Sequence, residues 1–330
     1  MSLIDSYNRK ISYLRLSVTD RCDLRCLYCM KEKMNFLPKK DLLSFEEISR
    51  LCDNFIDLGV NKIRLTGGEP LVRKNIIDLI QLLGSKIDNS SLKELTITTN
   101  GTLLSKYAEK IKKSGINRIN ISLDTLNKKK YKEITRFGLL DKVLEGIKIA
   151  KKNDLEIKIN TVALKNFNDD EFEKILLWCN KNKLDLTFIE VMPMNETDSH
   201  RYLQFIPLDN LYENLNKKFN FFKIDKNTGG PSKYYKSEKL DINIGFITPL
   251  TNNFCANCNR VRITSTGRLY LCLGQNEYVD FRDILRNDFT DSYIKEKILF
   301  ALNIKPKEHN FIIEKNVKPY MQRFMNVTGG

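Results

Sequence analysis

Three cysteines stand close together near the start of the chain, in the run TDRCDLRCLYC. Cys22, Cys26 and Cys29 follow a C-x3-C-x2-C spacing, which fits the ligands of an iron–sulfur cluster. Protein-held clusters of this kind usually take four thiolates, so three thiolates on a four-iron cube leave one iron open to a small molecule. Such a cluster performs chemistry as well as electron transfer. Three core cysteines or a zinc loop are the alternatives, but a structural zinc site requires a fourth ligand.

A second cysteine group lies in the C-terminal part of the chain. Cys255 and Cys258 form a CxxC pair, and Cys272 follows fourteen residues later. A zinc ribbon needs a fourth ligand, and the two cysteines still unassigned belong to apolar helical patterns. The group therefore favours a second three-thiolate cluster, while His200 and His309 remain open as candidate fourth ligands.

Two arginines follow the second CxxC pair directly, in the run Cys258-Asn-Arg260-Val-Arg262. On an extended segment, residues two apart lie on the same face. Arg260 and Arg262 are therefore suited to clamp a phosphate group through paired hydrogen bonds. An ordinary pair of surface arginines is the alternative.

The elements that position these residues alternate between short β-branched runs and amphipathic helices. The helix predicted over Ser44–Leu58 begins with a capping box of Ser44 and Glu47 and ends at Gly59. Cys52 and Cys179 continue apolar helical stripes and are predicted to be core residues. Six βα units predict a parallel sheet, either open and doubly wound or curved into an incomplete barrel. The predicted strands are Tyr13–Val18, Lys62–Thr66, Glu94–Thr99, Arg118–Leu123, Glu156–Val162 and Leu184–Val191.

One face of these strands is polar, although a parallel sheet covered by helices should be apolar on both faces. Burying so many unpaired donors would cost several kcal/mol each. A barrel too wide to be filled by side chains explains the pattern, because its lumen then holds a polar, negatively charged ligand. A solvated face of an antiparallel sheet is the alternative. The polar positions are Arg15, Ser17, Lys62, Arg64, Thr66, Thr96, Thr98, Arg118, Asn120, Ser122, Lys158 and Asn160.

The candidate functional segments follow the predicted strands in order. The first cysteine group follows the first strand, Gly67-Gly68-Glu69-Pro70 the second and Thr98-Thr99-Asn100-Gly101 the third. Ser122-Leu123-Asp124 ends the fourth strand, and Met192 follows the sixth. Since βα-barrel enzymes keep their chemistry at the C-terminal ends of the strands, we expect all these segments to share one site.

Length, composition and net charge indicate the general class of the protein. A chain of 330 residues has room for about two domains, and eight cysteines with two histidines favour thiolate-rich metal sites over disulfides. The sequence shows neither a leader pattern nor an apolar run that could span a bilayer, so we expect a cytoplasmic protein without a membrane partner. The net charge of +14 fits a polyphosphate or nucleic-acid partner, although a lysine- and asparagine-rich composition gives the same balance.

The spacing of the first cysteine group, Tyr28 before its last cysteine and the GGEP run resemble the radical S-adenosylmethionine (SAM) superfamily. In that superfamily the open iron chelates the amino and carboxylate groups of SAM. The paired cysteine groups, GGEP, TTNG, the CxxCxRxR run and the Gly-Gly C-terminus together resemble the GTP 3′,8-cyclase (MoaA) family of molybdenum-cofactor biosynthesis. This similarity extends from about Tyr7 to Gly330.

The resemblance implies an α/β fold, namely an incomplete (βα)6 TIM-type barrel with a smaller C-terminal α+β cluster-binding domain. We expect the barrel over residues 1–205 and the C-terminal domain over 206–330. Two 4Fe-4S clusters and SAM are the implied cofactors, and the last two glycines would reach into the site. The implied ligands of the two clusters are Cys22, Cys26 and Cys29 for the first and Cys255, Cys258 and Cys272 for the second. The implied SAM-binding residues are Tyr28, Gly68, Ser122 and Met192. The implied GTP-binding residues are Arg15, Arg64, Thr98, Lys158, Arg260 and Arg262.

The activity implied by the family is that of a lyase in molybdenum-cofactor biosynthesis. The reduced first cluster would cleave SAM to methionine and a 5′-deoxyadenosyl radical, which abstracts hydrogen from ribose C3′ of GTP. The C3′ radical would attack C8 of a guanine that faces the second cluster. The product, (8S)-3′,8-cyclo-7,8-dihydroguanosine 5′-triphosphate, would pass to cyclic pyranopterin monophosphate synthase. An electron donor is a further expected partner, a homodimer is left open, and no nucleic acid is expected.

Two positions depart from the family pattern. Asp23 stands where the family usually has asparagine, and Thr187 stands where it has arginine before the Phe-Ile-Glu run. The second change removes a cation from the expected triphosphate region. Two alternative functions are a radical SAM enzyme acting on a peptide or a tRNA, and a structural protein with two zinc ribbons.

Overall fold

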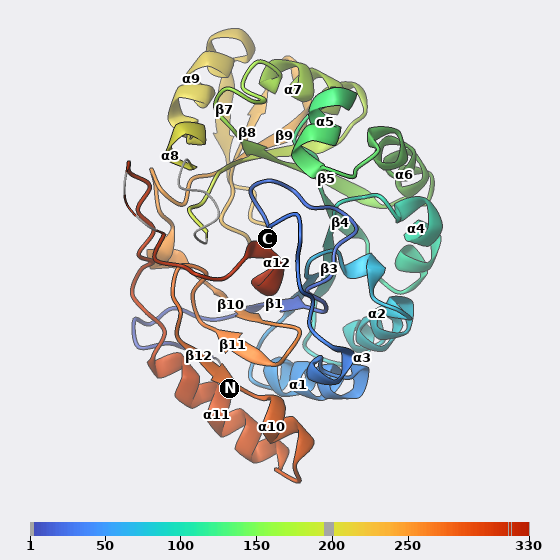
Figure 1. Ribbon diagram of the computed structural model, residues 1–330, viewed down its shortest axis with the longest axis vertical. Coiled ribbons are helices and arrows are strands. Elements are labelled where there is room, and N and C mark those ends of the chain that lie inside the picture. The colour runs from blue at the N-terminus through green and yellow to red at the C-terminus, as the bar shows by residue number, and fades with distance from the viewer. Residues whose placement is uncertain (1–2, 195–200, 316, 318, 330) are drawn as a thin grey trace.

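The computed structural model describes residues 3–194, 201–315, 317 and 319–329, and its centre is one curved sheet (Figure 1). All six strands predicted for the first part of the chain are present, and they pair in parallel in chain order. These strands are β1 (Tyr13–Ser17), β2 (Lys62–Thr66), β3 (Glu94–Thr99), β4 (Arg118–Ser122), β5 (Glu156–Ala163) and β6 (Asp185–Glu190). The predicted half-barrel is therefore confirmed.

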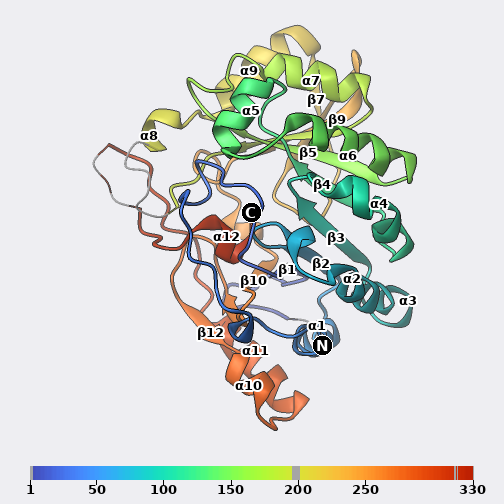
Figure 2. The same cartoon turned by 45° about the vertical axis from the view of Figure 1, so that its right-hand side comes forward.

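Helices surround this sheet on its outer side (Figures 1 and 2). The predicted capping box is present at the start of α1 (Phe45–Asp57), where Glu47 N–H donates to the Ser44 hydroxyl and Ser44 N–H to the Glu47 carboxylate. Cys52 and Cys179 lie in the core between helices and sheet, as predicted. The other helices of this part are α2 (Ile76–Gly84), α3 (Lys86–Asn89), α4 (Leu104–Lys113), α5 (Lys128–Thr135), α6 (Leu140–Lys152) and α7 (Phe172–Lys181).

The C-terminal part extends the same sheet at both edges, so that twelve strands follow the order β12-β11-β10-β1-β2-β3-β4-β5-β6-β9-β8-β7. β9 (Leu240–Ile247) pairs in parallel with β6, and β10 (Arg260–Ile263) pairs in parallel with β1. The remaining strands are β7 (Phe221–Ile224), β8 (Lys233–Ser237), β11 (Arg268–Tyr270) and β12 (Tyr278–Asp280). The remaining helices are α8 (Arg201–Gln204), α9 (Leu208–Phe219), α10 (Arg282–Arg286), α11 (Asp291–Asn303) and α12 (Met325–Thr328).

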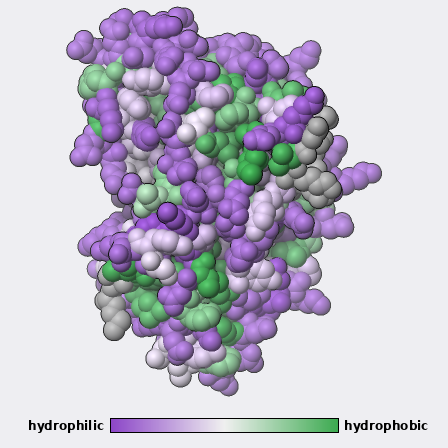
Figure 3. Space-filling view, turned by 90° about the vertical axis from the view of Figure 1, so that its left-hand side faces the viewer, coloured by the Kyte–Doolittle hydropathy of each residue, from purple (hydrophilic) through white to green (hydrophobic). Residues whose placement is uncertain are grey.

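The alternation of the strands separates two environments. The apolar positions, such as Leu14, Ile63 and Ile119, belong to the main hydrophobic core, whereas polar positions such as Arg15 and Asn120 line a cavity on the inner face. The C-terminus and α12 lie in the middle of this inner face (Figure 1). The side face in Figure 3 is largely hydrophilic, with two areas where hydrophobic side chains gather. Within the described residues, no helix has the length and apolar character needed to cross a membrane.

Candidate active site

The first cysteine group lies in the loop after β1, at the C-terminal end of the strands. Its three thiols are free and partly buried, and burial raises the pKa of Cys29 to about 12 and the pKa of Cys26 well above its usual range. Asp23, the first departure from the family pattern, connects this loop to the loop after β3. Its carboxylate accepts hydrogen bonds from Asn100 Nδ2 at 2.7 Å and from Thr102 Oγ1 at 2.6 Å.

The GGEP segment packs directly against the first cysteine loop. Gly68 N–H donates to the Thr19 carbonyl at 2.8 Å, and Glu69 N–H donates to the Arg21 carbonyl at 2.8 Å. A Cβ atom on Gly68 would lie 2.3 Å from the Arg21 carbonyl oxygen, so this close backbone approach requires glycine. The buried Glu69 carboxylate accepts hydrogen bonds from Asn100 N–H at 2.6 Å and from the Thr99 hydroxyl at 2.8 Å.

Two further residues expected to bind SAM lie near these loops. The Tyr28 hydroxyl donates to Asp124 Oδ2 at 2.7 Å, and burial raises the pKa of Asp124 to about 6. Ser122 is the last residue of β4 and pairs with Asn160 on β5. Met192 lies elsewhere: it lines the same cavity as the second cysteine group.

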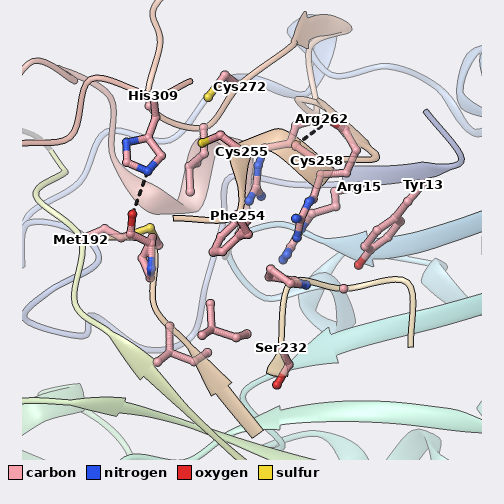
Figure 4. A pocket seen from close by; sticks show the side chains of 18 of the residues that line it. Tyr13, Arg15, Met192, Ser232, Phe254, Cys255, Cys258, Arg262, Cys272 and His309 are labelled. Atoms are coloured by element: carbon pink, nitrogen blue, oxygen red, sulfur yellow. Dashed lines mark hydrogen bonds between the residues drawn. The ribbon is translucent and has the colours of Figure 1, made fainter. Parts of the chain in front are cut away.

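The second cysteine group forms one end of that cavity, which Cys255, Cys258 and Cys272 all line (Figure 4). Burial raises the pKa of Cys258, but Lys305 and Arg260 outweigh burial and bring that pKa to about 7. Lys305 Nζ lies 3.6 Å from Cys258 Sγ and 3.2 Å from the Arg260 carbonyl oxygen. The sequence analysis did not single out Lys305, because it lies in a connecting segment far from the cysteines in sequence.

Of the two histidines considered as fourth ligands, His309 lies beside this group and His200 lies outside the described residues. Both ring nitrogens of His309 have hydrogen-bond partners. Nε2–H donates to the Pro249 carbonyl at 2.8 Å, and Nδ1 accepts from Phe311 N–H at 3.3 Å. In this arrangement the ring of His309 is not available as a metal ligand.

Three arginines stand side by side on the inner face of the sheet. The strand register pairs Arg262 on β10 with Arg15 on β1, and Arg15 with Arg64 on β2. Neighbouring strands are about 4.8 Å apart, and like charges placed directly opposite one another destabilise a sheet. Burial together with Arg64 and Arg260 lowers the pKa of Arg15 to about 10. An arrangement of this kind is typical of a site that is completed by an anion.

The cavity itself is strongly basic. Among the residues that the structure describes, five cations and no carboxylate line it. Several of its polar groups are buried yet have no hydrogen-bond partner within the described chain, including the Tyr13 hydroxyl, the Asn120 side chain and Arg64 Nε. Because buried polar groups are nearly always hydrogen-bonded, these groups indicate a polar ligand. The five cations are Arg15, Arg64, Lys158, Arg260 and Arg262.

Thr98 lies next to these residues, opposite Asn120 on the neighbouring strand, and its hydroxyl also makes no hydrogen bond within the described residues. Tyr13 was missed by the sequence analysis, although it precedes Arg15 by two positions and therefore shares its face. Its ring lies under two cations, with Lys62 Nζ at 5.3 Å and Arg64 Cζ at 5.6 Å from the centroid.

The C-terminal end of the chain contacts both the first cysteine group and the row of arginines. Met325 N–H donates to the Cys29 carbonyl at 3.3 Å, and Arg262 Nη1 donates to the Gly329 carbonyl at 2.7 Å. Gly329 adopts φ +72°, and a Cβ atom there would lie 1.6 Å from the Thr66 hydroxyl oxygen. Gly329 therefore reaches the site, whereas Gly330 lies outside the described residues.

The donor sets of the two cysteine groups fit iron–sulfur clusters. Each group brings together three free thiols, which affect one another's pKa values because they lie close to one another. No three cysteine, histidine or carboxylate side chains among the described residues meet at a single metal-ion position. A cube-shaped cluster binds each thiolate at a different iron, and thiolates bound to it are deprotonated despite their burial.

The fold and the first cysteine loop define a class of protein. The family model of the Radical SAM superfamily matches residues 16–179, and that of Molybdenum Cofactor Synthesis C matches residues 184–311. The fold also resembles that of Streptococcus suis SuiB bound to S-adenosylmethionine, with a TM-score of 0.62 and 18% identity. The match covers 90% of this chain and 69% of that one. The chain is thus a radical SAM enzyme, with the 4Fe-4S and SAM cofactors of that class.

Curated relatives narrow the class to one family. A GTP 3′,8-cyclase of Rhizobium etli (strain CIAT 652) is 53% identical over 329 residues, which cover 99% of this chain and 94% of that protein. The GTP 3′,8-cyclase of Mesorhizobium japonicum is 50% identical over 331 residues, covering both chains completely. That of Brucella ovis is 50% identical over 99% of this chain and 96% of the relative. The chain belongs to the GTP 3′,8-cyclase family.

Proposed function

We propose that this chain cyclises GTP to (8S)-3′,8-cyclo-7,8-dihydroguanosine 5′-triphosphate, with the nucleotide bound in the basic cavity. The row of Arg262, Arg15 and Arg64 is the observation that carries the site assignment. A triphosphate supplies several negative charges and many acceptor oxygens, so it relieves the repulsion within the row and can accept hydrogen bonds from the Tyr13 hydroxyl and Arg64 Nε. Arg260, Lys158 and Thr98 complete the proposed GTP site.

The cavity favours one orientation of the nucleotide. Its cysteine end holds Phe254, Cys255 and Cys258, whereas Ser232 lies at the other end (Figure 4). The triphosphate belongs among the cations, and the guanine then points to the second cluster. Cys255, Cys258 and Cys272 would hold that cluster through three thiolates, which would leave one iron open to a ring atom of guanine.

The first cysteine loop and its neighbours form the proposed SAM site. Cys22, Cys26 and Cys29 would hold the cluster that supplies one electron to cleave SAM into methionine and a 5′-deoxyadenosyl radical. The role of the chain is to bind, orient and exclude water. Gly68 brings the GGEP backbone against the cluster loop, and Tyr28 is held in place by Asp124. Ser122 and Met192 extend the proposed site toward the GTP cavity.

Chromatographic separation of the nucleotides followed by mass analysis tests this function. The anaerobically reconstituted protein is incubated with SAM, dithionite and GTP, and then the nucleotide and 5′-deoxyadenosine are quantified. We expect a nucleotide isomeric with GTP, formed together with 5′-deoxyadenosine. ATP serves as the control nucleotide and should not be converted. Cleavage of SAM that leaves GTP unchanged, or conversion of a peptide or tRNA instead, would contradict the proposal.

The open iron of the second cluster leads to a spectroscopic prediction. In a variant whose first cysteine group is replaced by alanine, the second cluster is the source of the electron paramagnetic resonance signal after reduction. We expect excess GTP to change this signal, because a guanine atom becomes an iron ligand, and we expect SAM to leave it unchanged. An identical spectrum with and without GTP would show that guanine does not bind the cluster.

Other expected partners and boundaries remain predictions. A one-electron donor is required for the chemistry, and cyclic pyranopterin monophosphate synthase is the expected acceptor of the product. The division into a barrel over 1–205 and a cluster-binding domain over 206–330, the cytoplasmic location and a homodimer also stay predictions.

A further inference from the structure

The floor of the basic cavity is formed by the loop between β7 and β8. Thr228, Gly230, Pro231 and Ser232 line the cavity, and the loop continues into β8 at Lys233. A second cavity, at the opposite ends of the strands, shares Lys158 and Thr228 with the first. The residues between the two cavities therefore determine how Lys158 is held.

Tyr234, on β8 directly after this loop, lines the second cavity. Its side chain is 2% exposed, and its hydroxyl accepts a hydrogen bond from Lys158 Nζ at 3.1 Å. The same hydroxyl lies 3.0 Å from Thr228 Oγ1. Because the Tyr234 oxygen accepts from Lys158, the Tyr234 hydroxyl proton can be donated to Thr228 in the loop. The ammonium groups of Lys158 and Lys226 each lie 5.6 Å from the centroid of its ring.

The loop also holds a second lysine. Lys62 Nζ donates to the Thr228 carbonyl and pairs with Glu94 at 2.6 Å. Thr228 thus connects the lysine at the start of β2 to Tyr234, and Tyr234 connects the loop to Lys158 on β5. One short segment of the C-terminal part therefore sets the positions of two cations that come from the barrel.

The loop is packed where this chain departs from its family pattern. Thr187 on β6 pairs with Gly245 on β9, and Gly245 pairs with Tyr234 on β8. A Cβ atom on Gly245 would lie 2.2 Å from Ser232 Oγ, 2.7 Å from Thr187 Oγ1 and 3.2 Å from the Tyr234 ring. Thr187, Ser232 and Tyr234 therefore all pack against Gly245.

We propose that Tyr234 is a positioning residue for the substrate: its hydroxyl holds the Lys158 ammonium at the floor of the cavity, where it meets the terminal phosphates of GTP. The inference rests on the proposed function and adds a residue to it. Tyr234 does not line the GTP cavity among the described residues, and it acts through Lys158. Burial together with Arg64 and Arg118 lowers the pKa of Lys158, so a fixed hydroxyl partner helps to keep this lysine in place before the anion arrives.

The test uses Tyr234→Phe, with Tyr235→Phe as the matched control. Successive residues of a strand point to opposite faces, and Tyr235 packs instead on Tyr212 and Phe246, with ring centroids 4.9 and 5.7 Å away. Phenylalanine keeps the ring in both variants and removes only the hydroxyl. The dissociation constants of GTP and GMP are measured by equilibrium dialysis on the reconstituted full chain, together with KM and kcat for GTP.

We expect Tyr234→Phe to raise the dissociation constant and KM of GTP by about 3- to 10-fold, the effect of one lost hydrogen bond. GMP binding, kcat at saturating GTP and SAM cleavage without nucleotide should stay unchanged, because Lys158 meets only the terminal phosphates. Tyr235→Phe should behave like the unchanged chain in every assay. Thr228→Val removes the second partner of the Tyr234 hydroxyl and should weaken GTP binding in the same direction, so it replaces Tyr234→Phe if that variant does not fold.

Three results would overturn the inference. An equal loss for GTP and GMP would indicate a general change in packing, and an equal loss in both tyrosine variants would indicate a structural role. Unchanged GTP binding in Tyr234→Phe and in Thr228→Val would show that Lys158 needs no positioning partner. If the unchanged chain binds no GTP, the proposed function itself is wrong, which is a different outcome from normal GTP binding in the variants.

Discussion

Replacing Cys22, Cys26 and Cys29 together by alanine is expected to abolish SAM cleavage and to leave about half of the iron in the protein. The three thiols lie in one loop after β1, separate from the cavity-lining Cys255 and Cys258. Without thiolate ligands the first cluster cannot assemble, whereas the second cysteine group keeps its own donor set. Iron and sulfide analysis and 5′-deoxyadenosine formation after anaerobic reconstitution measure the two effects.

Two core cysteines supply the control for this experiment. Cys52 and Cys179 are 1% and 0% exposed and belong to α1 and α7. Cys52→Ala and Cys179→Ala should retain the full iron content and SAM cleavage, at a cost in folding stability only. Full iron content in the triple variant, or zinc in place of iron in its second loop, would refute the assignment of two independent clusters.

Replacing Arg260 or Arg262 by alanine is expected to weaken GTP binding by about 1.5–3 kcal/mol, the range for a hydrogen bond to a charged group. This corresponds to a roughly 10- to 150-fold higher dissociation constant. Arg262 stands beside Arg15 in the row of like charges, so its removal also relieves repulsion in the nucleotide-free protein. Arg262→Ala also loses the hydrogen bond to the Gly329 carbonyl, so the midpoint of urea unfolding is measured beside binding. We expect weaker GTP binding, and SAM binding that hardly changes.

An arginine outside the cavity, Arg268, serves as the control. Arg268 on β11 pairs with Asp280 at 3.2 Å, and its side chain is 43% exposed. Arg268→Ala removes the same charge from the protein but should leave GTP binding unchanged. If Arg268→Ala weakens GTP binding as much as Arg262→Ala does, only the overall positive charge of the protein matters. The proposed phosphate contacts of Arg260 and Arg262 would then be wrong. Equal loss of GTP and SAM binding in the Arg260 or Arg262 variants would indicate misfolding.

The two departures from the family pattern have different consequences in the structure. Asp23 is compatible with its position, because its carboxylate accepts hydrogen bonds from Asn100 and Thr102 and so ties two loops together. Thr187 is 0% exposed, and its hydroxyl makes no hydrogen bond within the described part of the chain. It packs, like Ser232 of the loop and Tyr234 of β8, against Gly245.

The sequence by itself determined the local features of this protein. Cluster ligands depend on residue type and short spacing, so both cysteine groups were visible without any tertiary information. The period-2 alternation of the strands predicted an apolar outer face and a polar lumen, and the structure has both. The capping box of α1 was equally predictable, because both partners lie within four residues.

The tertiary structure alone decided which distant residues meet. Arg262 adjoins Arg15 because β10 pairs with β1, and neither the strand order nor the register is written in local spacing. Lys305 and Tyr234 lie in segments without a recognisable motif, yet they contact Cys258 and Lys158. Such contacts join residues far apart in the chain, and they form only when the whole sheet closes around the cavity. The cysteines that hold the clusters could thus be identified from short stretches of sequence. The arrangement of charged residues around the substrate depends on the whole fold.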